Sequence, residues 1–144
     1  MSAPYVDTSA LAKWYLNEPR SEDFEKFIGA QKAAWISRLT VVEFRCLLAR
    51  RRRAGEITAR IDGAVYDAFE RDIRQGALGL LPLQDQHVTS AAAMIGRLPR
   101  HPLRTLDALH LAIALDAKAD AVATADRIMA SASKDLGLKV IAFF

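Results

Sequence analysis

Four acidic residues occupy positions where strands are predicted to end and helices to begin. Asp7 and Asp126 each follow a short apolar segment directly or by one residue. Asp107 lies in the first turn of a strongly apolar helical segment, where the positive end of the helix dipole favours a carboxylate. Glu43 lies early in another helical segment.

Carboxylates that converge on one cleft repel each other and need a compensating cation. Oxygen ligands alone suit hard cations, chiefly Mg²⁺ or Mn²⁺. Such an ion polarises a phosphoryl oxygen and activates water, so the four acidic residues predict metal-dependent hydrolysis of a phosphodiester.

Helix capping is the competing interpretation for most of these residues. An Asp just before a helix, such as Asp7 or Asp126, is a common N-cap. Thr40 and Glu43 fit the spacing of a capping box. Asp107 is harder to explain in this way, because its apolar surroundings make an unpaired carboxylate costly.

Short apolar segments alternate with longer amphipathic ones, a pattern typical of a parallel sheet covered by helices on both faces. The predicted strands are residues 4–6, 33–36, 78–83, 121–124 and 138–143. The predicted helices are 10–16, 21–28, one capped by Thr40 and ending near Gly55, 57–73, 87–98, 106–117 and 127–136. We therefore predict one α/β domain over residues 1–144, an α/β/α sandwich with a mostly parallel sheet of about five strands.

The composition is that of an ordinary globular domain. Of 144 residues, 51% are hydrophobic and 26% charged, which argues against extended disorder. Cys46 is the only cysteine, so neither an intramolecular disulfide nor a cysteine zinc site can form, and we expect its thiol near the core. The sequence has neither a signal-peptide pattern nor an apolar run long enough for a bilayer, so we expect a cytoplasmic protein without a membrane partner.

Basic residues gather in two stretches, within a net charge of +3. Arg97, Arg100 and Arg104 precede Asp107, and Arg50 begins a run of four arginines. We predict that these residues bind substrate phosphates, although such runs are often only solvated surface. His110 lies on the same helix face as Asp107 and would orient it, relay a proton, or simply pack in the core.

The chain resembles PIN-domain ribonucleases, and most closely the VapC-type toxins of toxin–antitoxin pairs. The resemblance rests on four segments in the family's order and at compatible spacing: YVDTSAL at 5–11, LTVVE at 39–43, LDALHLA at 106–112 and TAD at 124–126. Each segment is weak alone, but the ordered set spans nearly the whole chain.

The resemblance implies a single PIN-like nuclease domain that acts as an Mg²⁺- or Mn²⁺-dependent endoribonuclease on structured RNA such as tRNA or rRNA. It also implies a homodimer and a VapB-like antitoxin whose C-terminal segment blocks the cleft. The implied metal-binding and catalytic residues are Asp7, Glu43, Asp107 and Asp126. Supporting positions are Thr8, Ser9, Thr124 and His110. Many relatives carry further acidic or polar groups beside the last motif, whereas Ala125 and Arg127 flank Asp126 here.

Other functions fit part of the pattern. A PIN-like module that binds RNA without cleaving it would not need four acidic residues, and a solitary PIN nuclease would lack an antitoxin. A haloacid-dehalogenase-like phosphatase also begins with an Asp after a strand, but it needs a second Asp where this chain has Ser9. A flap-type DNA nuclease needs additional helical segments.

Overall fold

The fold is built on a parallel sheet, here in a computed structural model that describes residues 2–144. Five strands pair within these residues in the order β3-β2-β1-β4-β5, and every pairing is parallel. The strands are β1 (Tyr5–Val6), β2 (Trp35–Ser37), β3 (Gly79–Leu81), β4 (Ala121–Thr124) and β5 (Lys139–Ala142). The predicted five-stranded α/β architecture is confirmed.

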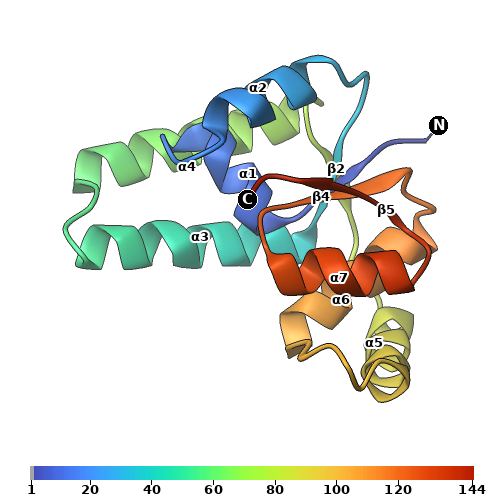
Figure 1. Cartoon of the computed structure of the whole chain (residues 1–144). Helices are drawn as coiled ribbons and strands as arrows, with labels where there is room; N and C mark the ends of the chain where they lie inside the picture. The colour runs from blue at the N-terminus through green and yellow to red at the C-terminus, as the bar shows by residue number, and fades with distance from the viewer. Residues whose placement is uncertain (1) are drawn as a thin grey trace.

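Helices cover both faces of this sheet (Figure 1). They are α1 (Thr8–Tyr15), α2 (Ser21–Gly29), α3 (Arg38–Arg53), α4 (Ala59–Arg74), α5 (Asp85–Arg97), α6 (Thr105–Asp116) and α7 (Arg127–Asp135). One hydrophobic cluster joins the sheet to α1–α4, and a second joins it to α5–α7.

Strand residues alternate between the two clusters, as the period of two in a β-strand requires. Val6 and Ala123 belong to the cluster on the α1–α4 side, whereas their neighbours Tyr5 and Val122 belong to the cluster on the α5–α7 side. Both faces of β1 and β4 are therefore buried, which explains why these segments are continuously apolar rather than alternating.

Helix α3 begins earlier than the sequence predicts. Its N-cap is Ser37, and Thr40 occupies the third helical position, where its Oγ1 accepts a hydrogen bond from the Ser37 backbone N–H at 3.1 Å. The prediction of Thr40 as the cap was wrong, because the helix starts directly after β2 without a connecting loop. Glu43 consequently lies beyond the first turn and is not part of a capping box. The expectation of a buried Cys46 was also wrong, because its thiol lies on the exposed face of α3.

Gly79 has a packing role at the start of β3. It pairs with Trp35 of β2, and a Cβ atom at this position would lie 2.8 Å from Trp35 Cδ1. The absence of a side chain at Gly79 thus leaves room for the Trp35 ring.

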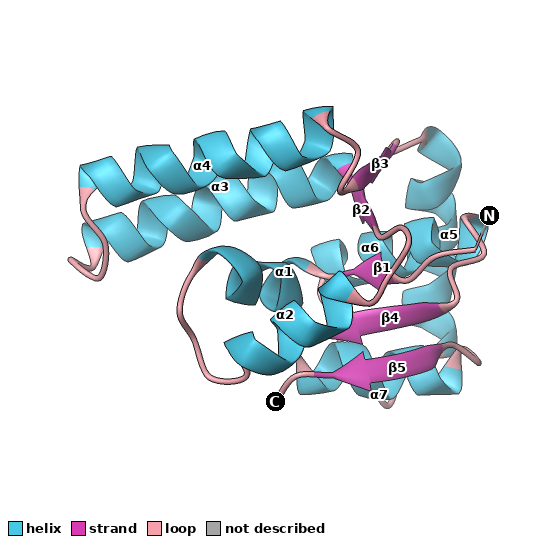
Figure 2. Cartoon of the chain, turned by 90° about the horizontal axis from the view of Figure 1, so that it is seen from above, coloured by secondary structure: helices cyan, strands magenta, loops and turns pink. Residues whose placement is uncertain are grey.

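Helices α3 and α4 form a hairpin that extends past the ends of the strands (Figure 2). Asp62 on α4 is buried and lies 3.2 Å from Arg45 Nη1 and 3.6 Å from Arg52 Nη1, both on α3. These ion pairs hold the hairpin together. No helix within residues 2–144 combines the length and apolar character needed to cross a bilayer.

Candidate active site

The strand order places Asp7 and Asp126 at the carboxyl ends of β1 and β4, where an open parallel sheet has its ligand-binding crevice. Strands β2 and β3 lie on one side of β1, and β4 and β5 lie on the other side. The strand order therefore reverses between β1 and β4. Ligands of open parallel sheets bind at the carboxyl ends of the strands at such a point. Asp7 directly follows β1 and Asp126 lies two residues after β4. The Asp7 backbone N–H also donates to the Ala123 carbonyl oxygen at 2.9 Å.

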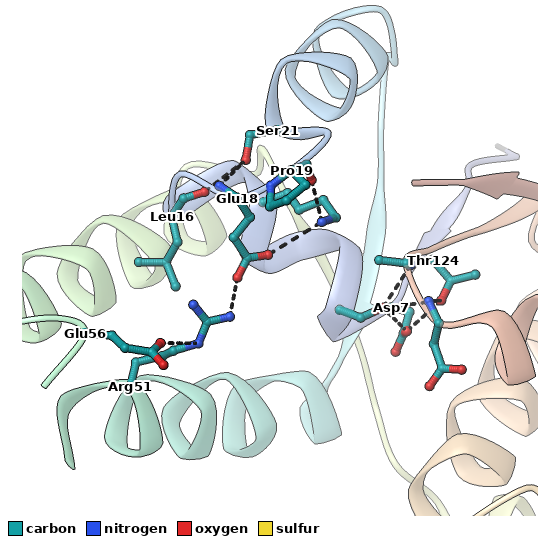
Figure 3. A network of polar contacts seen from close by, with 12 residues as sticks. Asp7, Leu16, Glu18, Pro19, Ser21, Arg51, Glu56 and Thr124 are labelled. Atoms are coloured by element: carbon teal, nitrogen blue, oxygen red, sulfur yellow. Dashed lines mark hydrogen bonds and ion pairs between the residues drawn. The ribbon is translucent and has the colours of Figure 1, made fainter. Parts of the chain in front are cut away.

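The carboxylate of Asp7 binds hydroxyl groups instead of capping a helix. Asp7 occupies the N-cap position of α1, yet among residues 2–144 no backbone N–H of that helix donates to its side chain. Its Oδ2 accepts hydrogen bonds from Ser9 Oγ at 2.7 Å and from Thr124 Oγ1 at 2.9 Å. Figure 3 shows Asp7 and Thr124 facing each other. The carboxylate is buried and is held in place by the first turn of α1 and by the end of β4.

The same two hydroxyl groups fix the backbone around Asp126. Ser9 Oγ accepts from the Ala125 N–H, and Thr124 Oγ1 accepts from the Asp126 N–H, both at 3.0 Å. The chain segment after β4 is therefore positioned by the side chains that hold Asp7.

Asp126 does cap the following helix. Its Oδ1 accepts hydrogen bonds from the N–H groups of Ile128 at 2.8 Å and Met129 at 3.1 Å. The capping interpretation is correct for this residue, and Oδ2 is the carboxylate oxygen outside the cap.

Asp107 lies in the first turn of α6, in electrostatic contact with two other carboxylates. Its Oδ2 accepts a hydrogen bond from the Arg104 N–H at 3.2 Å, and the Arg104 Nε lies 3.7 Å away. Burial raises the pKa of Asp107, and the charges of Asp126 and Asp7 raise it further. These effects outweigh the backbone hydrogen bond and the charge of Arg104, which lower the pKa. The pKa is thus raised first by burial and then by the like charges of the other two carboxylates.

Glu43 reaches the crevice from α3 and is held by two side chains. Its Oε1 accepts hydrogen bonds from Thr8 Oγ1 at 2.8 Å and from His110 Nε2. Burial alone would raise the pKa of Glu43, but the hydrogen bond and charge of His110, together with Thr8, lower it. Glu43 is therefore held in its ionised form.

His110 is buried beneath Glu43 in a chain of hydrogen bonds. Its Nδ1 lies 2.6 Å from the Tyr5 hydroxyl, and the Tyr5 hydroxyl donates to Ser37 Oγ at 2.9 Å. Burial would lower the pKa of His110, but the hydrogen bond to Glu43 and the nearby acidic charges raise it. Within residues 2–144, the hydrogen-bond partners of His110 are therefore Glu43 and Tyr5. Asp107, which we expected His110 to orient in one of three alternatives, is not among them.

Tyr5 was missed by the sequence reasoning. The available signal was strand alternation, since residues 5 and 7 lie on the same side of an extended chain. The weakness of that signal is that a tyrosine in a buried strand is more often only a core residue.

The predicted phosphate-binding arginines do not form one group. Arg104 lies at the carboxylates, and its side chain is 81% exposed. Arg97 and Arg100 line a separate cavity of about 330 Å³ with Leu98, Pro99, His101 and Asp135.

The arginine run on α3 is partly structural. Arg51 pairs with Glu18, which also lies 3.7 Å from the buried Lys13 Nζ, and with Glu56 at 3.3 Å (Figure 3). Arg52 pairs with Asp62. Arg50 is exposed, two helical turns or about 10 Å along α3 from Glu43.

The donor chemistry of this site fits a hard divalent cation in an open setting. Among residues 2–144, no three His, Cys, Asp or Glu side chains are gathered closely enough to enclose a metal ion. Mg²⁺ does not require such a cage, because it is usually held by one or two carboxylates, several waters and substrate phosphates. The carboxylates of Asp7, Asp107 and Asp126 are oxygen donors of the type that such an ion prefers.

The sequence model of the PIN domain matches residues 5–135, and the chain therefore belongs to the PIN-domain family. Over 99% of its length it is 33% identical to Ribonuclease VapC46 of Mycobacterium tuberculosis, of which it covers 98%.

Solved structures of other proteins share the fold. The crystal structure of VapC20 from Mycobacterium tuberculosis, a sarcin-ricin loop cleaving toxin, matches with a TM-score of 0.71, 18% identity and coverage of 90% of this chain and 95% of that one. The DNA-bound VapBC structure from Salmonella typhimurium matches with a TM-score of 0.72, 18% identity and full coverage of both chains.

Proposed function

We propose that this chain is an endoribonuclease that hydrolyses RNA phosphodiester bonds with the help of Mg²⁺ or Mn²⁺, and that it is the toxin of a VapBC-type toxin–antitoxin pair. The observation that carries the proposal is the carboxylate of Asp7, which occupies a helix N-cap yet binds the hydroxyl groups of Ser9 and Thr124 instead of the helix. It lies near enough to Asp107 for its charge, with that of Asp126, to add to the effect of burial in raising the pKa of Asp107. The relationship to Ribonuclease VapC46 supports RNA as the substrate.

Asp7 and Asp107 are the residues that would hold the ion, with Asp126 Oδ2 contributing from the rim. A bound divalent cation polarises a phosphoryl oxygen and lowers the pKa of water. Ser9 and Thr124 fix Asp7 in one orientation, which prevents its carboxylate from turning back to cap α1. Hydrogen-bonded partners of this kind keep ligand geometry and tune ligand basicity.

Glu43 orients water on the other side of the crevice. Thr8 and His110 occupy its Oε1, so Oε2 is the oxygen that is free to accept a hydrogen bond from an attacking water molecule. The lowered pKa keeps Glu43 ionised, and therefore an acceptor, at neutral pH. Arg104, largely exposed beside Asp107, would bind the phosphate.

The biological partner we propose is a VapB-like antitoxin, and the active form we propose is a homodimer. Solved relatives include VapBC complexes, which supports the antitoxin. Co-expression with the product of a neighbouring small open reading frame should suppress growth arrest caused by this chain. Growth arrest that no neighbouring gene relieves would favour a solitary PIN nuclease.

The direct test of the nuclease is cleavage of purified tRNA and rRNA with Mg²⁺, with Mn²⁺ or with EDTA. We expect cleavage with either ion, none with EDTA, and none by Asp7→Asn or Asp107→Asn. Asp67→Asn, on the exposed face of α4, is the matched control and should cleave normally. RNA binding without cleavage in any of these buffers would favour an inactive RNA-binding module.

A further inference from the structure

Phe144 lies at the edge of the sheet that is formed by the carboxyl ends of β4 and β5. Strands β4 and β5 pair with Thr124 opposite Ala142, and the Phe143 N–H donates to the Thr124 carbonyl oxygen at 2.9 Å. Phe144 therefore lies one strand away from the segment that carries Asp126. In Figure 2 the chain end marked C lies on the side to which the arrowheads of β4 and β5 point.

Two arginines from different elements hold Phe144. The guanidinium of Arg127, the first residue of α7, lies 4.2 Å from the centre of the Phe144 ring. Arg20, which precedes α2, donates from Nη1 to a main-chain oxygen of Phe144 at 2.8 Å. The ring and the guanidinium are thus placed together at the rim of the site.

Both groups remain accessible to a ligand. Phe144 is 41% exposed and Arg127 is exposed. Within residues 2–144 no carboxylate forms an ion pair with Arg127, although Asp126 is its neighbour in sequence. An aromatic ring and a planar guanidinium are the two kinds of surface on which unpaired nucleobases stack.

We propose that Arg127 and Phe144 form a stacking platform for an unpaired nucleobase next to the phosphodiester held at Asp7 and Asp107. The inference rests on the proposed ribonuclease function and adds a binding site for the substrate's base. Stacking tolerates any base, because every base presents a π-face. The platform therefore selects single-stranded or splayed RNA over a continuous duplex, without selecting a sequence.

The test measures binding of a fluorescently labelled single-stranded RNA of 12 nucleotides by anisotropy, in the Asp7→Asn background that prevents cleavage. Phe144→Ala and Arg127→Ala should each weaken binding about tenfold, the scale of one lost base stack. Phe144→Tyr retains the ring and should bind as the parent does. Val88→Ala, which changes an exposed apolar residue on α5, is the control and should also bind as the parent does.

A second set of measurements separates stacking from packing. Phe144→Leu retains apolar bulk without a π-face, so it should fold normally and still bind weakly. Replacing one nucleotide of the RNA by an abasic residue, position by position, should weaken binding to the parent at one position and have little further effect on Phe144→Leu.

Parental affinity in both Phe144→Leu and Arg127→Ala would overturn the platform while leaving the nuclease proposal intact. Equal abasic penalties in the parent and Phe144→Leu would overturn it too. A parent that binds no RNA would contradict the proposed function itself, and the platform with it.

Discussion

At the scale of single residues, the site depends on which hydrogen bonds each carboxylate accepts. Asp7 and Asp126 both precede helices. Asp126 caps its helix with Oδ1, whereas Asp7 Oδ2 accepts hydrogen bonds from two hydroxyl groups. The sequence favours neither outcome, since Asp before a helix is common in both roles. What distinguishes Asp7 is Thr124, which comes from a strand more than a hundred residues away and is placed by parallel pairing of β1 with β4.

Ser9→Ala and Thr124→Ala should each lower the cleavage rate about 10- to 100-fold, the usual effect of removing a partner that orients a metal ligand. Because both hydroxyl groups bind the same carboxylate oxygen, the double variant should lose less than the product of the two single effects. Single-turnover cleavage measures this, with Ser131→Ala on the exposed face of α7 as the control. Fully multiplicative losses would contradict a shared action through Asp7.

His110→Gln should lower the cleavage rate and change its dependence on pH. His110 lowers the pKa of Glu43, whereas burial raises it. When the imidazole is removed, the effect of burial is less opposed and the pKa of Glu43 rises. If ionised Glu43 is required, activity will then be lost at a higher pH as the solution is made more acidic. The acidic limb of the pH–rate profile should therefore move to higher pH, whereas His101→Gln on the α5–α6 loop should leave it unchanged. An unshifted limb in His110→Gln would contradict the role of the His110–Glu43 pair.

At the scale of elements, the helices and strands were largely predictable and one helix start was not. Alternating short apolar and longer amphipathic segments identified all five strands, because both faces of a parallel sheet are buried. The start of α3 was misplaced because Thr40 and Glu43 match a capping box as well as Ser37 and Thr40 match the real helix start. That error kept a capping role open for Glu43, whose hydrogen-bond partners Thr8 and His110 in fact come from other elements.

The α3–α4 hairpin makes a prediction at this scale. Asp62→Asn removes the negative charge that pairs with Arg45 and Arg52, so the free energy of unfolding should fall by about 1–2 kcal/mol, less than a fully buried charged pair would cost. Denaturant unfolding measures the change, and Asp67→Asn on the same helix should unfold as the parent does. Equal stability of the two variants would contradict the structural role of Asp62.

At the scale of the whole molecule, burial and the charges of Asp126 and Asp7 raise the pKa of Asp107, so ionising Asp107 costs folding free energy. The folded-state pKa of Asp107 is above its ordinary value, so the folded protein binds protons more readily than the unfolded chain. Its contribution to stability therefore falls as pH rises through the range between those two pKa values. A cation in the crevice would offset that loss.

Metal-free Asp107→Asn should accordingly have a higher thermal midpoint than the parent at neutral pH. Adding Mn²⁺ at about 100 times its Kd should stabilise the parent by about 2.7 kcal/mol, which corresponds to about 5–10 °C in a domain of this size. Asp107→Asn should gain much less. Differential scanning fluorimetry measures the thermal midpoints of both proteins. Equal shifts in the two proteins would place the bound ion away from Asp107.

The central claim is that the crevice between β1 and β4 binds the divalent cation used for RNA cleavage, and anomalous diffraction from crystals grown with Mn²⁺ tests it most directly. The account predicts an anomalous peak in contact with carboxylate oxygens of Asp7 and Asp107. A cleavage-competent protein whose Mn²⁺ peak lies elsewhere, or that shows no peak in the crevice, would contradict it.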